Sequence, residues 1–154
     1  MIVTVERACL DDFPRILAVW EASVRATHHF ITQEDIQYFK VLIRDSYLAM
    51  VDLYCALGGC GALKGFIGVA EGNIEMLFVA PAYFGRGVGS SLLKHAVSVL
   101  GADRVDVNEQ NERAIGFYEH HGFQVVGRSE VDGTGRPYPL LHMTLRGRDQ
   151  GRAG

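Results

Sequence analysis

The chain has 154 residues, which is enough for one compact domain and too few for two ordinary ones. Hydrophobic residues make up 48% of it and its formal net charge is -3, which argues against global disorder and against the basic surface of a nucleic-acid-binding protein. Apolar runs such as Met76–Pro81 are far shorter than the ~20 residues that span a membrane, and residues 1–7 lack the pattern of a secretory signal.

The three cysteines are Cys9, Cys55 and Cys60, and no two of them form a C-x-x-C pair. An odd number without such a pair provides neither a disulfide framework nor a zinc site. A thiol within an apolar segment is more typical of a core residue than of a nucleophile. We therefore expect a protein of the reducing cytoplasm that holds no metal and associates with neither membranes nor nucleic acids.

The first third of the chain predicts a strand followed by two helices. Apolar and polar side chains alternate over residues 3–7, as in a short strand. Asp11 or Asp12 is expected to cap a helix with an apolar stripe, and Thr32 is expected to cap a second one. The stripes consist of Ile16, Leu17, Trp20 and Val24 in the first helix and of Ile36, Phe39 and Ile43 in the second.

The rest of the chain combines short apolar runs, expected to be strands, with two further helices. The expected strands are Leu53–Leu57, Gly65–Ala70, Ile74–Val79, a segment around Val105 and Val107, Phe123–Arg128 and Leu140–Leu145. Apolar residues recur every four positions from Val88 to Leu100, and Asn111 and Gly122 are typical residues for the two ends of another helix. The order β-α-α-β-β-β-α-β-α-β-β predicts an α/β fold with helices flanking a central sheet. We expect a single domain over residues 1–146 and a flexible tail over residues 147–154.

A glycine-rich turn, Phe84-Gly85-Arg86-Gly87-Val88-Gly89, lies between an expected strand and an expected helix. Glycines let the backbone approach a ligand closely, and N–H groups at a helix N-terminus suit a phosphate. Arg86 adds a permanent positive charge that suits a phosphate. An ordinary strand-to-helix turn without a ligand would explain the glycines equally well. The spacing matches neither the G-x-G-x-x-G of dinucleotide-binding folds nor the G-x-x-x-x-G-K-[ST] phosphate loop. A phosphate bound here would need another kind of loop.

A second motif follows about 22 residues after this turn, where residues 111–123 have the form N-x-x-A-x-x-F-Y-x-x-x-G-F. A strand, a G-x-G turn and this segment, in this order, resemble the GNAT N-acetyltransferases. The expected element order agrees with that family over almost the whole chain, and residues 107–111, 127–132 and 137–141 are most similar to its small bacterial YjaB-type members. The resemblance implies the GNAT-type fold, a mixed and mostly antiparallel central sheet flanked by helices.

The resemblance also implies how acetyl-coenzyme A is bound. In that family a Q/R-x-x-G-x-G/A loop binds the coenzyme pyrophosphate through backbone N–H groups, and Gly87 and Gly89 match its glycines. Phe84 occupies the position where Gln or Arg is usual, so we expect binding to be retained with lower affinity. Strand 75–79 is expected to splay from its neighbour and to offer backbone groups to the pantetheine arm, one N–H polarising the thioester carbonyl. The expected coenzyme contacts are Leu77, Phe78, Val79, Phe84, Gly85, Arg86, Gly87, Val88, Gly89, Ser90, Asn111, Ala114 and Phe117.

Two residues are candidates for proton transfer. Tyr118 matches a family tyrosine near the thioester sulfur, which implies that it protonates the departing thiolate; a core aromatic residue is the alternative. An attacking amine must first lose a proton, and Glu75 is the first candidate for the base because parity places it on one face with Leu77 and Val79. A solvated carboxylate is the alternative for Glu75.

The acceptor side is expected to involve His28, His29 and Glu109, although surface positions would explain these residues too. Together the residues predict transfer of an acetyl group from acetyl-coenzyme A to an amine, by direct attack in a ternary complex. The acceptor is a protein lysine, a protein N-terminus or a small amine, and the protein is a monomer or a homodimer. A GNAT-like sensor or scaffold that binds acyl-coenzyme A without turnover is the alternative, although it would not need Tyr118. The glycine spacing excludes a nicotinamide-dependent oxidoreductase.

Overall fold

The computed structural model describes residues 3–146, and the chain divides into two compact units, Met1–Ala102 and Asp103–Gly154. The expected C-terminal tail, residues 147–154, lies outside the described residues. The expectation of a single domain over residues 1–146 stays a prediction.

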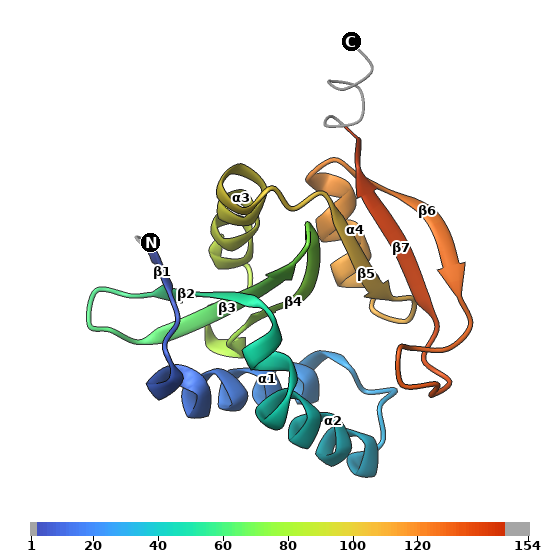
Figure 1. Cartoon of the computed structure of the whole chain (residues 1–154), viewed down its shortest axis with the longest axis horizontal. Coiled ribbons are helices and arrows are strands. Elements are labelled where there is room, and N and C mark those ends of the chain that lie inside the picture. The colour runs from blue at the N-terminus through green and yellow to red at the C-terminus, as the bar shows by residue number, and fades with distance from the viewer. Residues whose placement is uncertain (1–2, 147–154) are drawn as a thin grey trace. The chain divides into compact units, whose positions relative to one another are not determined.

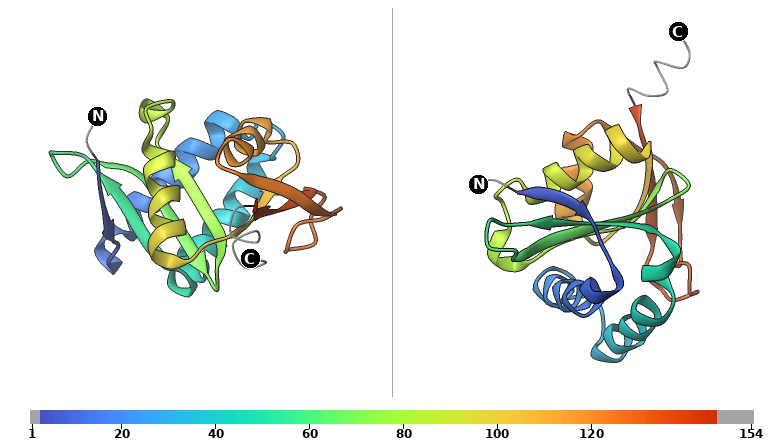
Figure 2. Two further views of the ribbon diagram at one scale, coloured as in Figure 1. Left: turned by 90° about the horizontal axis from the view of Figure 1, so that it is seen from above. Right: turned by 60° about the vertical axis from the view of Figure 1, so that its left-hand side comes forward.

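The first unit is built on an antiparallel sheet in the order β1-β2-β3-β4 (Figure 1). Its strands are β1 (Thr4–Arg7), β2 (Asp52–Leu57), β3 (Leu63–Ala70) and β4 (Asn73–Val79). Helices α1 (Phe13–Thr27) and α2 (Gln33–Asp45) lie on one face of this sheet, and α3 (Val88–Leu100) lies on the other (Figure 2). The unit therefore has three layers.

The apolar stripes of α1 and α2 bury against the sheet, as their spacing predicts. Ile16, Trp20 and Ile36 are almost fully buried in one cluster with Phe66 of β3 and Met76 of β4. On the opposite face, α3 buries its own stripe of Val88, Leu92, Leu93 and Ala96. Burying a large aliphatic or aromatic side chain contributes ~1.5–3 kcal/mol, so these two layers supply much of the unit's stability.

Gly65 of β3 lets α3 approach the sheet closely. A Cβ at Gly65 would lie 2.9 Å from the carbonyl oxygen of Phe78 and 3.2 Å from side-chain atoms of both Val88 and Leu92. The first of these distances, to β4, is shorter than real Cβ contacts allow, and the other two, to α3, are tighter than most of them, so a larger residue would press on both elements. This matters for the candidate site, because Val88 is the first residue of α3 and directly follows the glycine turn.

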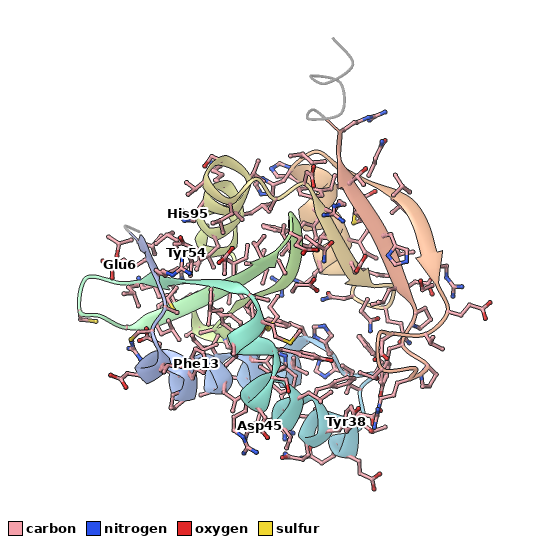
Figure 3. The ribbon with its side chains drawn as sticks, viewed as in Figure 1. Glu6, Phe13, Tyr38, Asp45, Tyr54 and His95 are labelled. Atoms are coloured by element: carbon pink, nitrogen blue, oxygen red, sulfur yellow. The ribbon has the colours of Figure 1, made fainter. Side chains whose placement is uncertain are left out.

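Ring packing also holds α3 against β2. The rings of Tyr54 and His95 lie 4.6 Å apart and point toward one another (Figure 3). Nε2 of His95 is buried there without a hydrogen-bond partner among residues 3–146.

The second unit contains an antiparallel sheet in the order β5-β7-β6, with α4 (Glu112–His120) packed on one face. Its strands are β5 (Arg104–Asn108), β6 (Phe123–Ser129) and β7 (Leu140–Leu145). Val105, Val107 and Met143 are buried together with Tyr118 and Phe123. Alternate residues of β5, such as Asp106, are exposed, so the other face of this sheet is open to solvent.

The expected order of strands and helices is confirmed, and most expected boundaries are right to within two residues. The side chains of Thr32 and Asn111 cap α2 and α4, accepting the N–H groups of Asp35 at 3.1 Å and Ala114 at 3.2 Å. Gly122 lies just beyond the C-cap of α4 with φ 94°, a left-handed conformation that favours glycine.

Asp12 lies at the expected cap position of α1, but the expected hydrogen bond from its side chain to the helix is wrong. Asp12 occupies the N-cap position, but its carboxylate accepts the Cys9 N–H at 2.9 Å and pairs with Arg15 at 3.0 Å instead of capping α1. The reason is a short 3-10 helix, η1 (Leu10–Asp12), which was not expected from the sequence. The Asp12 carboxylate accepts the backbone N–H of Cys9, the N-cap residue of η1, and so caps η1 instead of α1. Two further 3-10 helices, η2 (Tyr47–Met50) and η3 (Pro81–Tyr83), were not predicted either.

All three cysteines are free. Cys55 is a core residue, as expected, and burial raises the pKa of its thiol to about 12, which makes it a poor nucleophile. Cys9 and Cys60 are exposed, so the core interpretation fails for these two.

Candidate functional site

The glycine turn has the backbone geometry of an open anion site. Gly85 and Gly87 have φ 72° and 82°, left-handed values that a side chain would strain, and a Cβ at either position would meet no atom within 4 Å. The two glycines are therefore required by the backbone and leave open space beside it. The first hydrogen bond of α3 runs from the Ser91 N–H to the Gly87 carbonyl at 3.0 Å. The N–H groups of Val88 and Gly89, in the first turn of the helix, therefore lie before the first hydrogen bond of the helix. Such N–H groups, with the positive end of the helix dipole, favour a phosphate.

Two positive side chains flank this turn. Arg86 is exposed within it. Lys64 of β3 was not expected here from the sequence, and its Nζ lies 4.9 Å from the ring centre of Tyr83, at the end of η3. Phe84, which is partly buried, adds no charge. Lysines are common near the ends of strands, so the position of Lys64 in the sequence does not predict this contact.

Strand β4 presents its expected coenzyme contacts on two faces. Val79 pairs with Gly65, whose missing Cβ would contact α3, so Val79 lies on the α3 side of the sheet, and so does Leu77 by parity. Phe78 pairs with Phe66, and their rings stack at 5.7 Å on the α1 side. The backbone of this strand therefore separates two different environments.

Glu75 is the extra residue of a β-bulge. Gly68 pairs with Met76 and Val69 pairs with Ile74, which leaves Glu75 without a partner on β3, and its side chain is exposed. The bulge interrupts the period-two alternation on which a shared face with Leu77 and Val79 was inferred. Bulges are frequent beside active sites because they re-aim a side chain, and the sequence offered no sign of this one.

His28 packs against Phe78 of β4 through a ring contact, and one hydrogen bond of defined direction joins it to Thr27 of α1. Its ring centre lies 5.3 Å from that of Phe30 and 6.4 Å from that of Phe78. Oγ1 of Thr27 donates its proton to the Ser23 carbonyl at 2.8 Å and must therefore accept from Nδ1 of His28 at 2.7 Å. Nδ1 consequently carries the proton of the neutral ring, and Nε2 carries none.

Burial, followed by the charge of His29, lowers the pKa of His28 to about 4. The imidazole is therefore neutral at pH 7 and acts as a hydrogen-bond acceptor through Nε2 rather than as a strong base. His29 itself is exposed. The structure thus brings together one expected acceptor residue, His28, and one expected coenzyme contact, Phe78.

The remaining expected residues lie in the second unit. Tyr118 is 5% exposed, with its ring edge-on to those of Phe117 at 5.2 Å and Phe123 at 5.5 Å. Burial raises the pKa of Tyr118, so its phenol stays protonated at neutral pH. Asn111 and Ala114 are joined by the cap hydrogen bond at the start of α4.

Glu109 is already engaged by an arginine. Its two carboxylate oxygens accept from Nε and Nη2 of Arg128 at 2.7 and 3.1 Å, and this contact lowers the pKa of Glu109. An amine that bound to Glu109 would have to share or displace Arg128.

Within residues 3–146, no three His, Cys, Asp or Glu side chains cluster so that they could hold a metal ion. The described helices are too short or too polar to cross a membrane.

Comparison with known proteins identifies relatives along most of the chain. Residues 38–125 match the acetyltransferase (GNAT) domain model. The peptidyl-lysine N-acetyltransferase YjaB of Escherichia coli is 38% identical over 147 residues, which cover 96% of this chain and 99% of that protein. The solution structure of apo YjaB from Escherichia coli matches with a TM-score of 0.86 over 94% of this chain and 98% of that one, at 37% identity. The PaiA N-acetyltransferase of Thermoplasma acidophilum, solved with coenzyme A, matches with a TM-score of 0.76 over 94% and 99% of the two chains. At 19% identity, it supports the fold alone.

These matches confirm the expected fold class and the expected resemblance. They test none of the individual site residues, whose roles stay predictions.

Proposed function

Because the chain belongs to the GNAT acetyltransferase family, we propose that it transfers the acetyl group of acetyl-coenzyme A to an amine. The observation that carries this proposal is the open turn between β4 and α3, in which two left-handed glycines precede the N–H groups of a helix N-terminus. The amine attacks the thioester carbonyl directly in a ternary complex, and coenzyme A leaves as the thiol.

The coenzyme pyrophosphate binds to the backbone of residues 85–90, with Arg86 as the nearby positive charge. Backbone groups of Leu77, Phe78 and Val79 bind the pantetheine arm, and an N–H of this strand polarises the thioester carbonyl. Asn111, Ala114 and Phe117 are the further coenzyme contacts that the family resemblance implies. Phe84 replaces a charged or amide side chain with a ring and lowers the affinity.

Tyr118 donates a proton to the departing thiolate. Burial raises the pKa of Tyr118, which keeps the proton in place but weakens the phenol as an acid. A thiolate buried beside it would be destabilised in the same way, so the two shifts offset each other and proton transfer stays feasible.

The acceptor amine enters as an ammonium ion, because an ordinary lysine has a pKa of about 10.4. In our proposal Nε2 of His28, the unprotonated nitrogen, accepts a hydrogen bond from it, and the exposed carboxylate of Glu75 takes its proton directly or through water. His29 and Glu109 bind more remote parts of the acceptor.

A lysine side chain of a protein or peptide is the acceptor class that we propose. YjaB, to which 96% of this chain aligns, is named a peptidyl-lysine N-acetyltransferase. We place the reaction in the cytoplasm, in keeping with three free cysteines, and a monomer and a homodimer are equally compatible with it.

An acceptor screen at fixed acetyl-coenzyme A tests the proposal. Lysine peptides, peptides with only a free N-terminus, and polyamines are each incubated with the protein, and thiol release is recorded. We expect release that depends on the lysine peptide. Calorimetric binding of acetyl-coenzyme A without thiol release from any acceptor would instead support the sensor or scaffold.

A further inference from the structure

Three neighbouring strands of the second unit each place one polar side chain on the same face of the sheet. Nδ1 of His142 on β7 lies 2.6 Å from Oδ1 of Asp106 on β5, and its Nε2 lies 2.7 Å from Oγ of Ser129 on β6. The strand register explains this contact: Asp106 is directly opposite His142, and Ser129 is opposite Leu140, which makes it a diagonal neighbour.

The carboxylate fixes the direction of the first hydrogen bond, and the direction of the second follows for the neutral imidazole. A carboxylate only accepts, so Nδ1 of His142 carries the proton that it donates to Asp106. In a neutral imidazole Nε2 is then an acceptor, and the hydroxyl of Ser129 donates to it. A serine donating to a histidine that donates to an aspartate is the arrangement that activates nucleophilic serines in hydrolases on unrelated folds.

This relay is accessible to small molecules. The side chains of His142 and Asp106 are 38% and 41% exposed, and the buried residues Val105 and Met143 occupy the opposite face. Gly127 lies opposite His142 on β6, where a Cβ would come within 3.4 Å of the imidazole Cδ2. The absence of a side chain there leaves one flank of the ring uncovered.

We propose that Ser129 is an acyl-accepting nucleophile for small activated acyl esters and thioesters, with His142 as its base and Asp106 as the residue that orients the base. This goes beyond acetyl transfer to amines and uses none of the residues assigned to that reaction. Oγ of Ser129 attacks the acyl carbonyl while Nε2 of His142 takes its proton. The alcohol or thiol then leaves with that proton, and an ester to Ser129 remains. Water attacks this ester, His142 again accepts and returns a proton, and the carboxylic acid leaves.

The open face limits the rate. General-base catalysis contributes ~10²–10⁴-fold, and we expect the lower end because water competes for hydrogen bonds at side chains that are more than a third exposed.

The test measures hydrolysis of p-nitrophenyl acetate and of acetyl-coenzyme A without any amine, together with covalent labelling by a fluorophosphonate, which reacts with activated serines. Peptide mapping locates the label. We expect labelling at Ser129 and an ester hydrolysis rate about 100-fold lower in Ser129→Ala and in His142→Gln. The matched control is Ser98→Ala, because Oγ of Ser98 already donates its proton to the Lys94 carbonyl at 2.7 Å.

Thermal unfolding of each variant separates this role from a structural one. A network that only joins the strands would lower the melting temperature of Asp106→Asn and leave wild-type Ser129 unlabelled, which would overturn the proposal. Ester hydrolysis as fast in Ser129→Ala as in the wild type would overturn it too. Hydrolysis of the ester but not of acetyl-coenzyme A would support the nucleophile and restrict its substrates to esters.

Discussion

Replacing Gly87 with alanine separates the two reasons for a glycine in the turn before α3. Gly87 has φ 82°, and a Cβ built there meets no atom within 4 Å, so Gly87→Ala introduces backbone strain without a clash. Left-handed backbone costs ~1–2 kcal/mol for a residue with a Cβ, and the less flexible unfolded chain returns ~0.4–1 kcal/mol. We expect a net loss of roughly 1 kcal/mol in the free energy of unfolding, which lowers the melting temperature by about 2–4 °C.

The same methyl group would occupy the space that a pyrophosphate needs. We expect acetyl-coenzyme A to bind at least ~10-fold more weakly, equivalent to about 1.4 kcal/mol, as measured by calorimetry. Gly135→Ala is the matched control, because Gly135 has φ 83° and equally open surroundings but lies in the turn between β6 and β7. It should lose similar stability and keep wild-type affinity. Wild-type affinity in Gly87→Ala, or equal losses in both variants, would refute the assignment of the turn to the coenzyme.

Four further substitutions test the site and its support. Tyr118→Phe should lower kcat by ~10²–10⁴-fold with little change in KM for acetyl-coenzyme A, and turnover within about twofold of wild type would rule out the general acid. Phe84→Arg should tighten coenzyme binding by up to ~1 kcal/mol at low salt, measured by calorimetry; unchanged or weaker binding would show that the ring packs usefully. Gly65→Val should destabilise the protein by ~1–3 kcal/mol in urea unfolding, because its Cβ would lie 2.9 Å from the Phe78 carbonyl oxygen of β4 and 3.2 Å from side-chain atoms of α3; wild-type stability would contradict this close packing around Gly65. Burial lowers the pKa of His28 to about 4 in the folded protein, whereas an ordinary histidine has a pKa of about 6.5. Between these two values the unfolded chain binds a proton that the folded protein does not, so the folded protein loses stability as the pH falls from about 6.5 to 4. His28→Asn should reduce the stability difference between pH 7 and pH 5 by about 2 kcal/mol, and an unchanged difference in this variant would disprove the buried neutral ring.

The fold was predictable because its signals are local. The stripes of α1, α2 and α3, the caps at Thr32 and Asn111 and the apolar runs of the strands depend on residues within a few positions of each other. Asp12 is an exception. An aspartate before a helical stripe predicts a cap, but its carboxylate accepts the Cys9 N–H in a 3-10 turn that the sequence did not indicate.

The candidate site was less predictable because it depends on contacts between distant segments. The sequence indicated the turn by its glycines, but it did not show the bulge at Glu75, which arises from pairing with β3. It also did not show that Thr27 fixes the tautomer of His28, because that depends on where the hydroxyl proton of Thr27 goes. The Asp106, His142 and Ser129 relay joins residues of three different strands through the register of their pairing, and these residues follow no motif in the sequence.

The most direct test of acetyl transfer to lysine uses acetyl-coenzyme A and a peptide with one lysine and a blocked N-terminus. Thiol release and the acetylated peptide are measured in the same sample, the second by mass spectrometry with the acetylated atom located by fragmentation. We predict one acetyl group on the lysine Nζ for each thiol released, above the release without peptide. Thiol release that the peptide does not increase, or coenzyme binding with neither product, would contradict the proposed function.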